Sequence, residues 1–414
     1  MDRDTILPDR DVLITGSRLV AIVPASRHAP AGVSTIDGTG KYVIPGLWDS
    51  HVHALDLPIE VAQRLLAFGI TSVRDMGSLG DSLPFRRAAW QSMPSGTPRL
   101  WAAGPLIDGP RQRWRHAIAW HLTDPTGAEQ VVDSLTRLGA DFVKVYNTLS
   151  RPSYLALAAA ATQRGLPIAG HLPFTVSTSD ALAVGQRSFE HAGPELVSLD
   201  CVVDGKARYS RLLGVWGARG YGAYLAGLDS LRRDREPGCT RNLQAQLAER
   251  GAFIVPTIVN AIRDSLTVNW RALAQVDSAS RAACDGTIEM FHAATDAQRQ
   301  RYHQDFLEDV YTLHRRGATL VAGTDFPNAC VVPGASLHDE LAWLTRAGMA
   351  PYEALRAATV NAARLVAADD SLGTLRPGML ADLVVLSDDP RRDVRAVASI
   401  VAVVKDGRVV FRRD

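Results

Sequence analysis

Short apolar runs alternate with amphipathic stretches through the middle of the chain. Each run has the length of one strand and the stretch after it has helical spacing, so the pattern predicts strand–helix units around a parallel sheet. Eight runs qualify as strands of this sheet, at residues 47–53, 71–75, 99–103, 142–146, 168–171, 188–191, 253–259 and 319–325. Eight such units in series make a (β/α)8 TIM barrel, so we expect an α/β fold of that kind.

Strand-like segments also occur at both ends of the chain. Residues 11–44 and 382–411 are rich in Val, Ile and Leu, and each contains a turn signal, Thr15-Gly16-Ser17 in the first and Lys405-Asp406-Gly407-Arg408 in the second. We interpret both ends as one small composite β-sandwich domain. Its expected bounds are residues 1–44 and 376–414, and the barrel takes residues 45–375.

Two stretches of the barrel segment are too long for simple connections between strands. They cover residues 192–252 and 260–318. Patterns such as Asn242-Leu243-Gln244-Ala245-Gln246-Leu247 indicate helices within them. We therefore expect two helical insertions that form a lid.

Polar side chains end several predicted strands, where barrels of this kind carry their chemistry. The first strand ends His51-Val52-His53. Residues two apart on a strand point to the same side, so both imidazoles can reach one cation. Taken alone, this motif fits a structural role equally well. Three further strands end in His171, His191 and Asp325.

Lys144 lies inside an apolar predicted strand, where a bare ammonium group carries a severe desolvation cost. Either a carboxylate pairs with it, or the amine reacts with carbon dioxide to give an anionic carbamate that can bridge two metal ions. Each polar strand residue has an ordinary structural alternative, such as a satisfied core histidine or a helix-capping aspartate. Six in order along one barrel favour a metal site: His51, His53, Lys144, His171, His191 and Asp325.

Composition narrows the partner of this site to a small molecule. The 414 residues are 46% hydrophobic and 21% charged with a net charge of +1, and no long basic run occurs. Neither nucleic acid nor an anionic membrane surface is indicated. No apolar run reaches the roughly 18 residues of a membrane span. The start of the chain lacks the apolar core of a signal peptide, so the chain as given reads as cytoplasmic, and we expect a homo-oligomer.

The four cysteines lie far apart and lack CxxC spacing: Cys201, Cys239, Cys284 and Cys330. This pattern predicts neither a disulfide framework nor a thiolate zinc cluster. Any metal should therefore be held by imidazole and carboxylate groups.

Seven motifs together are typical of one superfamily: Pro45-Gly46-Leu47-Trp48-Asp49-Ser50-His51-Val52-His53, Thr71-Ser72-Val73-Arg74-Asp75, Val143-Lys144-Val145-Tyr146, Gly170-His171, Glu190-His191-Ala192-Gly193, Gly323-Thr324-Asp325 and the tail at 372–386. Through them nearly the whole chain resembles the amidohydrolase superfamily, in the branch of imidazolonepropionase-like, prolidase-like and ochratoxin-degrading enzymes. The resemblance implies two divalent ions, zinc by preference. One would be held by His51, His53 and Asp325, the other by His171 and His191, with carboxylated Lys144 bridging them.

The implied reaction is hydrolysis of an amide C–N bond by metal-activated hydroxide. Metal binding lowers the pKa of water towards about 7 and polarises the carbonyl. Asp325 would act as general base and then general acid, passing the proton to the leaving nitrogen.

Several alternatives to amide hydrolysis stay open. Ester, lactone and phosphotriester hydrolysis would use the same attacking group. A mononuclear deaminase is less favoured, because such enzymes place Glu three residues after the histidine of the fifth strand, where this chain has Phe174. A non-catalytic scaffold is least favoured, because all six ligand positions carry a suitable residue.

Four residues are candidates for binding the substrate. Tyr146 follows Lys144 by two residues on the same strand face, although packing is its structural alternative. Arg115, His116 and His121 lie in the loop after the third strand, which a solvated basic loop would explain equally well. If one of these three binds a carboxylate, dipeptides or N-acyl amino acids are the substrates.

Relatives usually begin with one more strand, often after a signal peptide, before the segment equivalent to residues 7–14. Either the small β-domain is reduced in this chain, or the protein begins upstream. In the second case, a periplasmic or secreted protein is expected.

Overall fold

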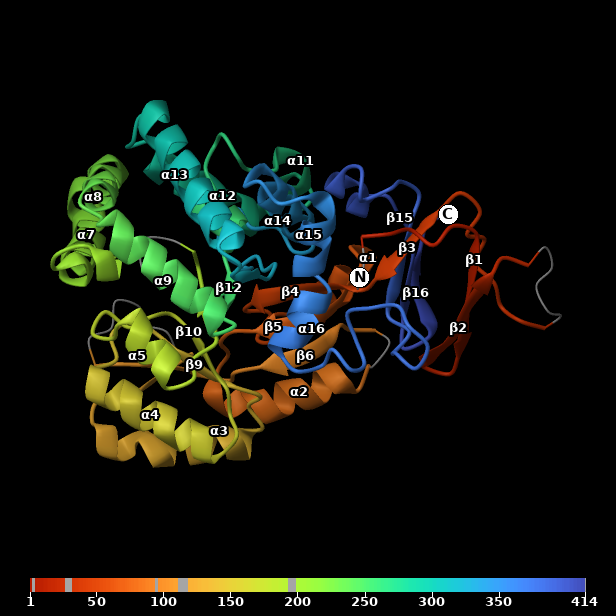
Figure 1. The fold of residues 1–414 in the computed structure, drawn as a ribbon, viewed down its shortest axis with the longest axis horizontal. Coiled ribbons are helices and arrows are strands. Elements are labelled where there is room, and N and C mark those ends of the chain that lie inside the picture. The colour runs from red at the N-terminus through yellow and green to blue at the C-terminus, as the bar shows by residue number, and fades with distance from the viewer. Residues whose placement is uncertain (2–3, 27–31, 94–95, 111–117, 193–198, 414) are drawn as a thin grey trace.

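The computed structural model describes the chain except residues 2–3, 27–31, 94–95, 111–117, 193–198 and 414 (Figure 1). Eight parallel strands form its centre: β4 (Leu47–Val52), β5 (Ile70–Asp75), β6 (Arg99–Ala102), β9 (Val143–Val145), β10 (Ile168–Gly170), β11 (Ser188–Glu190), β12 (Phe253–Val255) and β13 (Thr319–Leu320). Every strand of the barrel that the sequence predicts is present. Two short strands, β7 (Leu106–Asp108) and β8 (Ala119–His121), extend the sheet beside β9.

Backbone hydrogen bonds close these strands into the predicted barrel. Between the last and first strands, the Ser50 amide donates to Ala322 over 3.0 Å and the Asp325 amide donates to His51 over 2.7 Å. Between β6 and β9, the Asp141 amide donates to Ala102 over 2.9 Å. The strands are mostly buried, because helices cover them outside and buried side chains, several of them polar, fill the interior.

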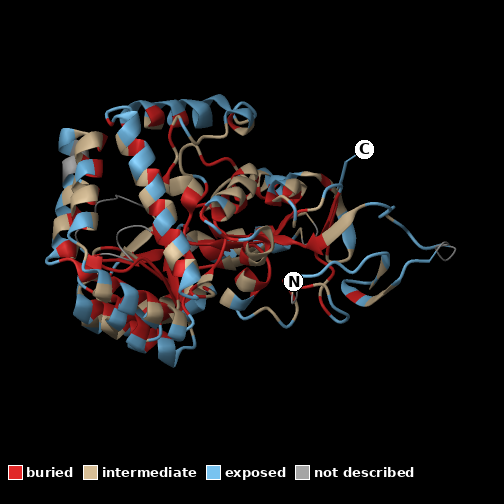
Figure 2. Ribbon diagram, turned by 45° about the horizontal axis from the view of Figure 1, so that its top comes forward, coloured by how far each residue is buried: buried red, intermediate tan, exposed pale blue. Residues whose placement is uncertain are grey.

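Helices follow the strands as the amphipathic pattern predicts: α1 (Ile59–Ala67), α2 (Leu83–Gln91), α3 (Ala128–Leu138), α4 (Arg151–Gln163), α5 (Thr178–Ala183), α14 (Ala335–Arg346), α15 (Pro351–Ala357) and α16 (Val360–Leu365). Their ends follow local chemistry. Ser150 caps α4 by accepting from the Ser153 amide, and α3 ends at Gly139, whose φ of 78° suits a residue without a side chain. Figure 2 shows the buried strands inside this layer of helices.

The long connections around β12 are helical. Between β11 and β12 lie α7 (Gly205–Arg219), α8 (Tyr221–Arg233) and α9 (Pro237–Glu249); between β12 and β13 lie α10 (Ile258–Ala261), α11 (Trp270–Leu273), α12 (Ser278–Phe291) and α13 (Asp296–Arg315). The two groups share an apolar cluster in which Tyr221 stacks on Phe291 at 4.3 Å between ring centres.

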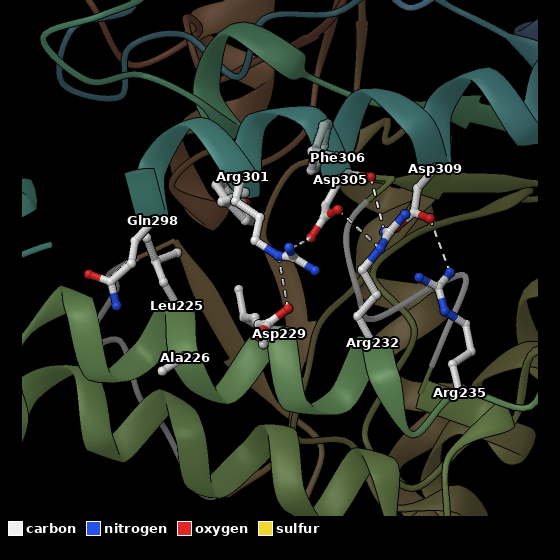
Figure 3. Close-up of a pocket in the computed structure, with 12 residues that line it drawn as sticks. Leu225, Ala226, Asp229, Arg232, Arg235, Gln298, Arg301, Asp305, Phe306 and Asp309 are labelled. Carbon is white, nitrogen blue, oxygen red and sulfur yellow. Dashed lines mark hydrogen bonds and ion pairs between the residues drawn. The ribbon is translucent and has the colours of Figure 1, made fainter. Parts of the chain in front are cut away.

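A hollow of about 150 Å³ separates α8 from α13, and ion pairs bridge it (Figure 3). Asp309 binds Arg232 at 2.9 Å and Arg235 at 3.0 Å, and Arg301 binds Asp229 at 3.1 Å. The charged side chains that line this hollow pair with one another, and these ion pairs connect the two insertions.

Two disulfides correct the expectation drawn from cysteine spacing. Cys201 pairs with Cys239 and ties the segment after β11 to α9, while Cys284 pairs with Cys330 and ties α12 to the loop after the last strand. The partners are 38 and 46 residues apart in sequence. Only the folding of the insertions brings them together, so local spacing carries no signal of the pairing.

Both ends of the chain contribute to the small antiparallel β-domain. A four-stranded sheet has the order β16 (Arg408–Arg412), β15 (Ile400–Lys405), β14 (Leu383–Leu386), β3 (Tyr42–Pro45), and β1 (Arg10–Thr15) pairs with β2 (Arg18–Pro24). The Leu19 amide donates to Met379 over 2.9 Å, which attaches the hairpin to the C-terminal segment. Among the described residues, no helix has the length and apolar character to cross a membrane.

Candidate metal centre

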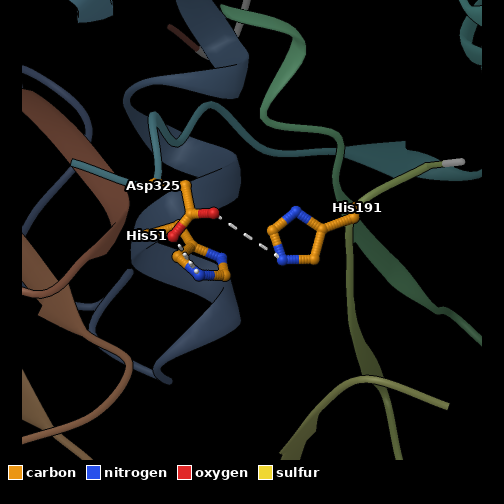
Figure 4. Close-up of side chains that lie close together, drawn as sticks. All are labelled: His51, His191 and Asp325. Carbon is orange, nitrogen blue, oxygen red and sulfur yellow. Dashed lines mark ion pairs between the residues drawn. The ribbon is translucent and has the colours of Figure 1, made fainter. Parts of the chain in front are cut away.

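Three predicted ligands converge where the barrel strands end (Figure 4). Ligand atoms of His51, His191 and Asp325 all lie within 4.8 Å of one another. His51 is the fifth residue of β4, His191 follows β11 directly, and Asp325 belongs to the segment after β13. Distant parts of the sequence thus meet because the carboxyl ends of parallel barrel strands share one rim.

The Asp325 carboxylate is the centre of the group. Its Oδ1 lies 3.3 Å from His51 Nε2 and 3.4 Å from His53 Nε2, and its Oδ2 lies 4.0 Å from His191 Nε2. Although burial alone raises the pKa of this carboxyl group, the imidazoles hold it well below its usual range. Asp325 is therefore ionised, as a metal ligand or general base requires.

Each of the four predicted histidine ligands turns its Nδ1 away from this centre. The partners are Glu190 Oε2 for His51 at 2.8 Å, the Gly77 carbonyl for His53 at 3.1 Å, Asn147 Oδ1 for His171 at 2.7 Å and Thr257 Oγ1 for His191 at 2.7 Å. An imidazole that donates from Nδ1 keeps a lone pair on Nε2, which is the state that binds metal.

The histidines on the β10 and β11 side are neutral as well as oriented. Burial, together with the Lys144 charge, places the pKa of His171 well below its usual value. Burial lowers the pKa of His191 to about 3. The two rings stand edge to face, with centres 4.8 Å apart. At neutral pH both imidazoles are therefore uncharged, and each can offer a nitrogen lone pair to a metal ion.

Lys144 is buried among these groups. It is the middle residue of β9 and is 1% exposed. Its charge is one reason that the pKa values of His171 and His191 are lowered, which places the ammonium group near both rings. The structure thus brings Lys144 to the histidines that the sequence assigns to the same site.

Glycine is required beside two of the candidate ligands. Gly170 has a φ of 129°, and a Cβ there would lie 2.3 Å from the Val145 carbonyl oxygen. A Cβ on Gly323 would lie 2.8 Å from the Cβ of His51. Without side chains, these positions let neighbouring strands approach closely enough to bring His171 and Asp325 to the rim.

Backbone conformation marks the site independently of its side chains. His191 and Asp325 both have a φ of 63°, and Thr257 has a φ of 47°. Residues with a side chain seldom adopt this left-handed region unless the surrounding structure holds them there. His191 and Asp325 carry candidate ligand atoms at the rim, and Thr257 contacts the Nδ1 of His191.

Sequence reasoning missed the groups that support the ligands. Glu190 binds Arg74 at 2.7 Å as well as His51, and it accepts a hydrogen bond from Ser188 over 2.7 Å. The buried pair of Arg74 with Glu190 has a signal in the sequence, because two opposite charges occur within apolar strands. Asn147, Thr257 and Asn260 carry no such signal, since polar residues are common after strands.

Asn260 lies in α10, just after β12, and contacts the central carboxylate. Its Nδ2 donates to Asp325 Oδ2 over 2.6 Å. The start of α10 is held in turn by Glu340, whose two carboxylate oxygens accept from the Ile258 and Val259 amides over 3.0 and 2.9 Å. The second insertion therefore contributes directly to the site.

The predicted substrate-binding residues divide into two groups. Tyr146 lies against His171, with ring centres 4.2 Å apart, and so borders the candidate metal centre. His121 ends β8, is exposed, and its Nδ1 is 3.0 Å from the Gly109 carbonyl oxygen. Arg115 and His116 lie outside the described residues.

Phe174 occupies the position at which a deaminase would carry an acid. Its amide donates to the Asn147 carbonyl over 2.9 Å, and its ring meets Tyr209 of α7 at 6.1 Å between centres. The side chain thus packs against the apolar cluster of the insertions. The phenyl ring of Phe174 can neither donate nor accept a proton.

Comparison with known proteins gives a consistent result. The model of the amidohydrolase family matches residues 247–410. An adenine deaminase 2 of Rhizobium etli is 28% identical over 97% of this chain, which spans 57% of the length of that relative. A bottromycin amidohydrolase structure aligns with a TM-score of 0.75 at 25% identity, over 97% of this chain and 82% of that one. A Xaa-Pro dipeptidase with bound methionine shares the fold, with a TM-score of 0.66 at 19% identity over 97% and 94% of the two chains.

Proposed function

Because this chain belongs to the amidohydrolase superfamily, as its motifs predict, we propose that it is a metal-dependent hydrolase of amide C–N bonds. The substrate class that we propose is a dipeptide or an N-acyl amino acid. The observation that carries the proposal is the common orientation of four imidazoles, each with Nδ1 hydrogen-bonded and Nε2 left for a metal, around one ionised carboxylate.

The donor set of imidazole nitrogens and a carboxylate oxygen suits zinc. We assign His51, His53 and Asp325 to one ion and His171 and His191 to a second. A divalent cation held here would activate water for attack and polarise the carbonyl group of the substrate. The neutral state of His171 and His191 supports this assignment, since a protonated imidazole binds no metal.

Lys144 completes the set in this proposal as a carbamate. The ammonium group first loses one proton, and its Nζ then forms a bond to the carbon of carbon dioxide and loses a second, so that a buried cation would become an anion between the two groups of ligands. The support for this step is the burial of Lys144 among neutral imidazoles, where an ammonium group is costly and an anion beside metal ions is not.

Asp325 moves the proton in the proposed reaction. Its carboxylate is ionised before the reaction, so it can accept a proton from the attacking water and then pass it to the nitrogen that leaves. Asn260 holds Oδ2 through a hydrogen bond of 2.6 Å, which fixes the direction of the carboxylate during both transfers.

Deamination is the second candidate, because an adenine deaminase is among the relatives. The Phe174 side chain argues against it, since this position offers no acid to protonate a ring nitrogen. Ester, lactone and phosphotriester hydrolysis use the same attacking group and are tested together with amides.

The test is a substrate screen of the zinc-loaded protein. The panel contains dipeptides, N-acyl amino acids, adenine, lactones, aryl esters and phosphotriesters. We expect amine release from one of the first two classes, loss of activity with a chelator, and loss of activity in Asp325→Asn. Turnover that is confined to another class, or that resists the chelator and the substitution, would overturn the proposal.

A further inference from the structure

Arg263 lies beside the candidate metal centre with one edge of its guanidinium group unused. It follows α10 in the sequence, between β12 and α11, and Nη1 donates to the Asn260 carbonyl oxygen. Nε is buried and has no hydrogen-bond partner among the described residues. An arginine normally satisfies its Nε when it is buried, so this edge is ready for an acceptor from outside the chain.

The charge of Arg263 has no ion-pair partner within 4.0 Å among the described residues. The neighbouring Asp264 is engaged elsewhere, with His303 at 3.0 Å and Arg299 at 3.4 Å. The carboxylate that acts on Arg263 electrostatically is Asp325, whose oxygens already face the imidazoles. A buried guanidinium group destabilises the folded protein unless an anion pairs with it.

Aromatic side chains lie near this cation. The guanidinium carbon lies 5.8 Å from the ring centre of Phe291, and the Tyr221 ring stacks on Phe291 with the two ring centres 4.3 Å apart. Tyr221 and Tyr302 also interact electrostatically with Arg263. Walls of this kind exclude water and so strengthen a charge-assisted hydrogen bond to a ligand.

Asn260 connects this cation to the reacting groups. Its backbone carbonyl holds Arg263, and its side chain holds Asp325. Asn260 therefore links the guanidinium group, through Nη1, to the carboxylate that moves the proton. A substrate whose scissile bond lies at Asp325 would place a nearby acidic group against Arg263.

We propose that Arg263 binds the carboxylate of the substrate, through the Nε edge of its guanidinium group. This inference rests on the proposed function and narrows it: the enzyme selects amides whose leaving amine carries a free carboxylate, as the amino acid released from an N-acyl amino acid or a dipeptide does. The specificity then resides in the insertion after β12. The loop after β6, in which the sequence offers Arg115, His116 and His121 as candidates, would be unnecessary for it.

Matched pairs of substrates test this role. Each pair contains an N-acetyl-L-amino acid and its uncharged amide, and the variants are Arg263→Gln, Arg263→Lys and, as a control on exposed α12, Arg281→Gln. For Arg263→Gln we expect KM for the acid to rise about 30-fold or more, the loss typical of removing one half of a buried charge pair. KM for the amide should change little, Arg263→Lys should recover part of the loss, and Arg281→Gln should resemble the wild type.

The preference for acid over amide decides the inference. A wild type without that preference, or an Arg263→Gln variant that keeps it, would overturn it. If the wild type hydrolyses neither member of any pair, the proposed function fails for this class, and binding decides instead: the acids must raise the unfolding temperature of the wild type and fail to raise that of Arg263→Gln. Absence of any rise in the wild type would overturn the inference as well.

Discussion

His51 and Glu190 are joined by a hydrogen bond of 2.8 Å between Nδ1 and Oε2, and both side chains are buried. The other carboxylate oxygen of Glu190 binds Arg74 at 2.7 Å. Arg74 also donates to the Ser50 carbonyl oxygen over 2.8 Å, so the network returns to the strand that carries His51. This arrangement fixes the imidazole with its Nε2 lone pair facing Asp325.

Replacing Glu190 by Gln should weaken metal binding without removing a ligand. The amide would offer N–H to His51 Nδ1, which favours the opposite tautomer and places the proton on Nε2. We expect the dissociation constant for zinc to rise about 10- to 100-fold, as for other outer-shell partners of histidine ligands. Competition with a chromophoric chelator measures it. Glu249→Gln, at the end of α9, is the control, and equal affinity in both variants would refute the assigned role.

Lys144→Ala should abolish hydrolysis and leave a space that a small carboxylic acid can fill. Loss of a bridging anion should cost more than the roughly 100-fold typical of an outer-shell partner. Acetate or propionate added to Lys144→Ala should restore part of the activity, because either supplies the missing carboxylate. Lys144→Arg, which forms no carbamate and leaves no space, should show no rescue. Rescue of both variants, or full activity of Lys144→Arg, would contradict a carbamate.

The disulfides Cys201–Cys239 and Cys284–Cys330 should stabilise the insertions. Each closes a loop that is open in the reduced unfolded chain, so we expect reduction to lower the free energy of unfolding by roughly 2–4 kcal/mol per bond. Urea unfolding with and without reductant measures the difference. Four reactive thiols in protein unfolded without reductant would contradict the pairing.

His338 should make stability depend on pH between about 6.5 and 4. Its Nε2 lies 2.9 Å from the Phe68 carbonyl oxygen, and burial lowers its pKa from 6.5 to about 4. Between these values the unfolded chain binds a proton that the folded chain does not. The contribution of His338 to the free energy of unfolding is therefore fully present above pH 6.5. It is lost as the pH falls from 6.5 through 4, and the loss is roughly 1–3 kcal/mol.

The variant His338→Gln isolates this contribution, because an amide can still donate to Phe68 but does not titrate. Denaturant unfolding of the two proteins between pH 4 and 8 should show that the variant becomes more stable relative to the wild type as the pH falls. A difference that is the same at every pH would show that His338 does not contribute in this way.

The fold and the candidate ligands were predictable because both depend on local patterns. Each barrel strand is a short apolar run, and each of His51, His171 and His191 ends or follows such a run. The remainder depends on contacts between distant segments. Asn260, just after β12, contacts Asp325 in the segment after β13, and each cysteine pairs with a partner 38 or 46 residues away. No spacing in the sequence records such contacts.

Anomalous scattering from zinc-loaded crystals tests the central claim most directly. We expect strong peaks among His51, His53, His171, His191 and Asp325, with nitrogen ligands at roughly 2.0–2.1 Å through Nε2. The Nδ1 atoms should keep the partners described above. Crystals that are saturated with zinc and show no peak among these side chains would contradict a metal-dependent hydrolase.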